Sequence, residues 1–165
     1  MSLTILIRTQ LSSIPVLADV CFTQANYGAN VGGNSTLSVN TPRGVLGGSV
    51  AGISPGLDYT VVPCTTALQP VGLFVNDAAG AAFENSPAVA SGKIAVIKGL
   101  ASVEVDVYET NETNAAPVVY AVGDFLYSSA QGLLTTTDAG TQTVIGIVTK
   151  RPSTASPTLG LDERI

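Results

Sequence analysis

The clearest pattern along the chain is an alternation of valines with acidic or aromatic residues over residues 103–109, VEVDVYE. Successive side chains of a β-strand point to opposite faces, so this pattern predicts a strand with one buried and one solvent-facing side. A second apolar run, residues 94–97 (IAVI), precedes it and is joined to it through Gly99. We expect the two runs to pair as a hairpin.

Further short runs of β-branched or aromatic residues follow one another along the chain, separated by turn residues. Helical periodicity is nearly absent, and Gly80 and Pro87 interrupt the Ala-rich residues 78–90, which leaves room for one short turn of helix. Near the carboxyl end, Leu159, Leu161 and Ile165 predict a final edge strand. The other predicted strands are residues 58–62, 71–75, 118–122, 125–128, 133–137 and 144–149. The predicted fold is therefore all-β: a small barrel or sandwich of short antiparallel strands.

The first part of the chain differs in composition from the rest. Residues 26–33 and 42–52 are rich in Gly and Asn. We interpret residues 1–50 as an extended N-terminal arm with isolated strands and residues 51–165 as the barrel-like domain; loops and edge strands packed on that domain are an equal alternative for the first segment. Within the domain, Gly72 and Gly146 each interrupt an apolar strand, where a glycine allows either a bend or a close approach of two backbones as a sheet curls.

Composition limits the kinds of partner. Of the 165 residues, 45% are hydrophobic and 12% are charged, so a monomer would leave much apolar surface in water. We infer that other subunits cover part of this surface. The net charge of −5 and the scattered basic residues argue against a nucleic-acid partner. No apolar stretch approaches the roughly 20 residues of a membrane helix, so we expect no membrane partner.

The two cysteines, Cys21 and Cys64, are expected to be free thiols. The N-terminal sequence MSLTILIRTQL lacks the basic start and cleavage site of a secretory signal, so we expect assembly in a reducing cytoplasm. Disulfides are rare in that compartment.

Side chains for catalysis or metal binding are scarce. The chain contains no histidine, which removes the usual nucleophile–base systems and His-ligated zinc. The Gly-rich residues 44–52 lack the Lys and the following helix of a phosphate-binding loop. Asp58 and Asp124 both follow turns, but nothing else supports them as a catalytic carboxylate pair. The remaining acidic cluster, Glu104, Asp106, Glu109 and Glu112, is interpreted as a solvated strand face in preference to a calcium site. We predict no enzyme, no catalytic residue, no cofactor and no metal.

Two segments carry a resemblance to a known group of proteins. Residues 70–93 (PVGLFVNDAAGAAFENSPAVASGK), followed by the strand that ends at residues 108–110 (YET), form the first. Residues 120–137 (YAVGDFLYSSAQGLLTTT), followed by VIGIVTK at 144–150 and LGLD at 159–162, form the second. Together they make residues 54–165 resemble the decoration, or cement, proteins of tailed-bacteriophage capsids.

The resemblance implies a structural virion protein and no enzyme. Such a protein binds the outer surface of the expanded capsid and stabilises it by bridging subunits of the major capsid protein, commonly as a homotrimer. It would be assembled in the host cytoplasm and reside on the capsid exterior. The alternative is a phage tail or spike component that binds a host glycan, although the absence of Trp weakens it because sugar-binding faces commonly use aromatic platforms.

Overall fold

The computed structural model describes residues 3–5, 16–21, 44–54, 61–75, 78–79, 93–99, 101–111, 116–140 and 142–165. These residues form strands, turns and bends, and none of them is helical. The strands are β1 (Leu3–Ile5), β2 (Val16–Cys21), β3 (Gly44–Val45), β4 (Val50–Ile53), β5 (Val61–Pro63), β6 (Pro70–Phe74), β7 (Ala78–Ala79), β8 (Lys93–Ile97), β9 (Ser102–Val105), β10 (Phe125–Ser128), β11 (Leu134–Thr135), β12 (Gly146–Lys150) and β13 (Leu159–Glu163).

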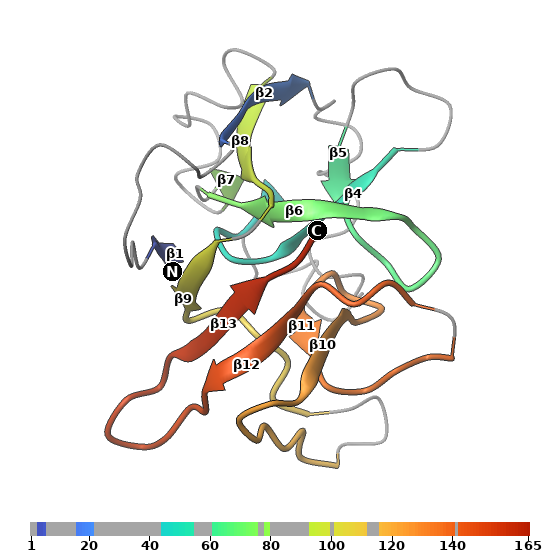
Figure 1. The fold of residues 1–165 in the computed structure, drawn as a ribbon. Coiled ribbons are helices and arrows are strands. Elements are labelled where there is room, and N and C mark those ends of the chain that lie inside the picture. Colours follow the sequence, from blue (N-terminus) through green and yellow to red (C-terminus); the bar gives the residue numbers. More distant parts are fainter. Residues whose placement is uncertain are drawn as a thin grey trace.

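The strands form two main antiparallel sheets, as Figure 1 shows. The six-stranded sheet has the order β1-β9-β13-β12-β10-β11, and one of the two sheets curls into a half-barrel. The five-stranded sheet has the order β2-β8-β6-β4-β5, and β3 pairs with β7 separately. The all-β prediction is confirmed.

The predicted hairpin of residues 94–97 with residues 103–109 is wrong. β8 lies in the five-stranded sheet, where it pairs with β6, whereas β9 lies in the six-stranded sheet between β1 and β13. Gly99 has a φ of 94°, a left-handed conformation that suits glycine. The short connection therefore carries the chain from one sheet to the other instead of folding it back on itself.

Two further predictions about strands are also wrong. β13 is not an edge strand, since it pairs with β12 on one side and β9 on the other. Every second residue of β13 is fully buried, which fits a central position. Residues 118–122 form no strand; they run into a turn that precedes β10.

Gly72 and Gly146 do mark close approaches of the backbone. A Cβ atom on Gly72 would collide with the carbonyl oxygen of Ile97, on β8. A Cβ atom on Gly146 would lie 2.6 Å from the carbonyl oxygen of Asp162, on β13. Side chains at these positions would push neighbouring strands apart, so the close approach is the alternative that the structure shows.

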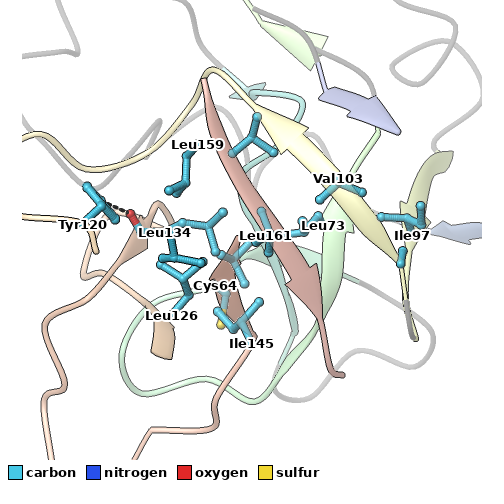
Figure 2. Close-up of a cluster of buried hydrophobic side chains, with 14 residues drawn as sticks. Cys64, Leu73, Ile97, Val103, Tyr120, Leu126, Leu134, Ile145, Leu159 and Leu161 are labelled. Carbon is cyan, nitrogen blue, oxygen red and sulfur yellow. Dashed lines mark hydrogen bonds between the residues drawn. The ribbon is translucent and has the colours of Figure 1, made fainter. Parts of the chain in front are cut away.

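One hydrophobic core lies between the two sheets, and Figure 2 shows its main side chains. Leu73 and Ile97 come from the five-stranded sheet, and Leu126 and Leu161 come from the six-stranded sheet; all four are fully buried. The sheets also meet through a hydrogen bond of 2.6 Å from the Ser128 hydroxyl to the Cys64 carbonyl. Burial of these apolar side chains supplies the main force that holds the sheets together.

The N-terminal residues contribute strands to both sheets. β1 lies at an edge of the six-stranded sheet, beside β9, and β2 lies at an edge of the five-stranded sheet, beside β8. Residues 6–15 and 22–43 lie outside the described residues, and so does most of the Ala-rich segment 78–90. The division into an arm and a domain at residue 50 stays a prediction.

Candidate binding surface

In the acidic strand face predicted at β9, Glu104 forms an ion pair with Lys150. Glu104 accepts hydrogen bonds of 2.9 Å from the Lys150 ammonium and from the Thr158 hydroxyl. The hydrogen bond from Lys150, followed by that from Thr158, lowers the pKa of Glu104 below its ordinary value. Asp106 is exposed, and Glu112 lies outside the described residues. Among the residues that the structure describes, no three Cys, Asp or Glu side chains come together to hold a metal ion.

The other candidates for chemistry have structural roles where they are described. Asp124 accepts a hydrogen bond of 2.7 Å from the Ala121 amide and so closes a turn. Asp58 lies outside the described residues. In the Gly-rich segment 44–52, the Gly48 amide donates to the Phe74 carbonyl at 2.7 Å. This amide is therefore already used by the protein backbone.

Cys64 has a free thiol in the core, as the sequence predicts. Burial raises its pKa to about 11, and a hydrogen bond with Ser128 opposes that rise. Because the thiolate is the reactive form, this cysteine is a poor nucleophile near neutral pH.

The most distinctive surface feature is a group of exposed apolar side chains just before and at the start of β10. Val119 is 74% exposed, Val122 is 67% exposed and Phe125 is 50% exposed. We call these three residues the apolar turn. Among the described residues the other large exposed hydrophobic side chain is Ile53, at 49%, on β4 of the other sheet.

Hydrogen bonds to its backbone hold the apolar turn in place. The Gly123 amide donates to the Val148 carbonyl and the Val148 amide donates to the Asp124 carbonyl, each at 2.9 Å. The Thr136 hydroxyl donates to the Val119 carbonyl at 3.0 Å. Gly123 has a φ of 98°, which favours glycine at this point of the turn. The turn is thus tied to β12 and to the segment after β11.

Tyr120 anchors the same segment from beneath. Its ring is buried and stands edge-on to Tyr108, with ring centroids 5.5 Å apart. Its hydroxyl lies 2.6 Å from the Glu109 carbonyl and 2.9 Å from the Leu134 carbonyl, and Figure 2 marks the second contact. Burial raises the pKa of Tyr120, so the hydroxyl stays protonated and able to donate.

This arrangement is suited to binding a protein surface. A side chain of Val or Phe contributes about 1.5–3 kcal/mol when it is fully buried, and hydrogen bonds already hold the backbone of the turn in the unbound protein. Sequence reasoning missed the site because it placed residues 118–122 in a strand. The available signal was the dipeptide Gly123-Asp124, which is typical of a turn, directly after three valines in five residues.

Comparison of the chain with protein-family models, curated proteins and solved structures finds no match. Within the described part of the chain, no helix has the length and apolar character that a membrane span requires.

Proposed function

We propose that the chain is a decoration protein that binds the outer surface of an expanded phage capsid and bridges subunits of the major capsid protein. The observation that carries the proposal is the apolar turn: Val119, Val122 and Phe125 are exposed on a segment fixed by hydrogen bonds. Exposed apolar side chains on a segment held in this way fit a permanent protein partner.

The wider chemistry of the chain supports the same function. The low charge content of 12% suits a protein whose apolar surface is covered by neighbouring subunits. The acidic net charge of −5 favours contact with protein over contact with DNA. The resemblance of residues 54–165 to capsid decoration proteins points the same way.

Stabilisation of a capsid requires a difference in affinity between two states of the shell. A protein that binds the expanded lattice more tightly than the unexpanded one shifts the equilibrium toward the expanded form. Many copies bound side by side add their contributions over the whole shell. The expected sites are positions where several major capsid subunits meet, occupied by a homotrimer of this chain because a trimer matches a local threefold axis.

Binding to purified shells tests the proposal. Shells assembled from the major capsid protein of the same genome, in expanded and unexpanded forms, are sedimented with the full chain. We expect the chain to sediment with expanded shells and to remain largely in solution with unexpanded ones. Equal binding to both forms, or binding to neither, would reject a decoration function.

A matched pair of variants locates the contact. Val122→Ser combined with Phe125→Ser removes two exposed apolar side chains, and we expect at least about a tenfold loss of affinity because about 1.4 kcal/mol corresponds to tenfold. Ile53→Ser is the control, since Ile53 is as exposed as Phe125 but lies on the other sheet. If the control loses affinity and the double variant keeps it, the contact surface lies elsewhere.

A further inference from the structure

Glu163 is a buried carboxyl group without a polar partner. It is the last residue of β13, it is 1% exposed, and neither of its side-chain oxygens has a hydrogen-bond partner. Its position follows from the alternation along β13, which places Leu159, Leu161 and Glu163 on the core side of the sheet. A polar group buried in this way costs stability, so its presence calls for an explanation.

No charged group faces Glu163 from the strands beside it. Its cross-strand partner on β12 is Gly146, and its amide donates to the Ala101 carbonyl, ahead of β9, at 2.7 Å. The charged side chains of these two strands, Glu104 and Lys150, pair with each other on the opposite face of the sheet.

The remaining described surroundings of Glu163 hold no opposite charge either. β10 and the five-stranded sheet turn apolar residues into the core, among them Leu126, Leu73 and Ile97, while Lys98 and Arg164 are exposed. Among the described residues, the other titratable groups in the core are Cys64 and Tyr120, and burial raises the pKa of both, so both are neutral near neutral pH.

The end of β13 lies at the joint between the two sheets. The Gly99 amide, in the connection from β8 to β9, donates to the Ile165 carbonyl. The Arg164 amide donates to the Ile145 carbonyl at 2.8 Å. Residues 163–165 therefore join the connection between the sheets to the start of β12, and Glu163 lies on the core side of this joint.

We propose that Glu163 is a proton-controlled latch, which closes the joint between the sheets when its carboxyl is protonated and loosens it when the carboxyl is ionised. Burial raises the pKa of Glu163 from 4.5 to about 9, so the group is neutral in the folded protein at neutral pH. Ionisation in the core would leave a charge with no partner. The latch is a property of the fold and does not depend on what the chain binds.

The direction of the pH effect follows from proton binding. Between pH 4.5 and about 9 the folded state holds a proton on Glu163 that the unfolded state has lost. The contribution of Glu163 to the free energy of unfolding is therefore greatest below pH 4.5. It falls as pH rises from 4.5 to about 9 and is constant above about 9. The unfolding constant changes by up to about tenfold per pH unit.

Urea unfolding of the full chain at a series of pH values within this window tests the latch. We expect the wild type to lose stability steadily as pH rises, and Glu163→Gln to show little pH dependence while it remains folded. Glu104→Gln is the matched control, because it removes a glutamate on the other face and should keep the wild-type slope. A flat wild-type profile, or an unchanged slope in Glu163→Gln, would overturn the proposal.

Two measurements connect the proton to the joint and do not depend on urea. Carbon-13 NMR of glutamate carboxyls in the wild type should show one of the five glutamates titrating far above 4.5. Amide hydrogen exchange, compared at one alkaline pH, should be slower in Glu163→Gln than in the wild type at residues 99, 163 and 164, whose amides donate the hydrogen bonds of the joint. The latch is contradicted if none of the five carboxyls titrates well above 4.5, or if exchange at these amides is equal in the two proteins.

Discussion

Glutamate side chains on the two faces of the six-stranded sheet have pKa values shifted in opposite directions. On the outer face, Glu104 is bound by Lys150 and Thr158, and these contacts lower its pKa. On the inner face, one strand away, Glu163 has no partner and burial raises its pKa to about 9. Glutamate is thus ionised on the outer face and protonated on the inner face. The difference arises because the outer face gives access to water and to a cation.

Apolar side chains show the same contrast between the faces. Leu126, on the inner face of β10, is fully buried, whereas Phe125, its neighbour in the chain, is 50% exposed on the outer face. Phe125 pairs across the strands with Ile147 of β12, which is partly exposed. Inner-face apolar groups stabilise the fold, and outer-face groups near the apolar turn are available for a partner.

The largest expected effect comes from truncation on the inner face. Leu161→Ala should lower the free energy of unfolding by about 2–5 kcal/mol, because Leu161 is fully buried in the core and the substitution leaves a cavity. Phe125→Ala, the outer-face control, should change it by about 0.5 kcal/mol or less. Urea titrations of both variants measure the difference. Similar losses in the two would mean that the apolar turn is part of the folding core.

An intermediate effect is expected from the anchor beneath the apolar turn. Tyr120→Phe leaves the Glu109 and Leu134 carbonyls without the hydroxyl donor, which should cost about 1–3 kcal/mol. Tyr108→Phe is the control, since the Tyr108 hydroxyl bonds the Pro157 carbonyl at 2.9 Å in an exposed position. In thermal unfolding, the midpoint temperature of Tyr120→Phe should be well below that of Tyr108→Phe. Equal midpoint temperatures would show that the buried hydroxyl of Tyr120 contributes no more to stability than the exposed hydroxyl of Tyr108.

The smallest effect is expected for the ion pair on the outer face. Glu104→Gln should cost less than about 1 kcal/mol near neutral pH, because the partly exposed pair is screened by solvent. The lowered pKa of Glu104 means that its contribution is present above the ordinary value of 4.5 and is lost as pH falls through the lowered folded value. Unfolding at neutral and acid pH, with low and high salt, measures this contribution. If Glu104→Gln still lowers the free energy of unfolding in acid and in high salt, the loss does not come from the ion pair with Lys150.

Local pattern is sufficient to predict several of the strands. β10 has the predicted bounds, and the alternation of burial over residues 102–107 follows from the alternation of valine with acid. β6 and β12 match their predictions to within two residues at each end. These elements are encoded by side chains that repeat at period two, which a single sequence displays directly.

Pairing of strands, in contrast, depends on contacts between distant residues. Nothing near Gly99 indicates that β8 and β9 separate into different sheets, because their partners, β6 and β13, come from elsewhere in the chain. The central place of β13 and the burial of Glu163 have the same origin. The apolar turn was hidden because its valines fit a strand locally, and its hydrogen bonds to residues 136 and 148 are long-range.

Cryo-electron microscopy of virions or shells that carry the full chain would locate it on the particle. We expect density for the chain on the outside of the expanded shell, in groups of three at local threefold positions, with Val119, Val122 and Phe125 buried against the capsid or a sister subunit. Density on the tail would support a tail or spike component. Density on the shell with the apolar turn facing solvent would contradict the assignment of this surface.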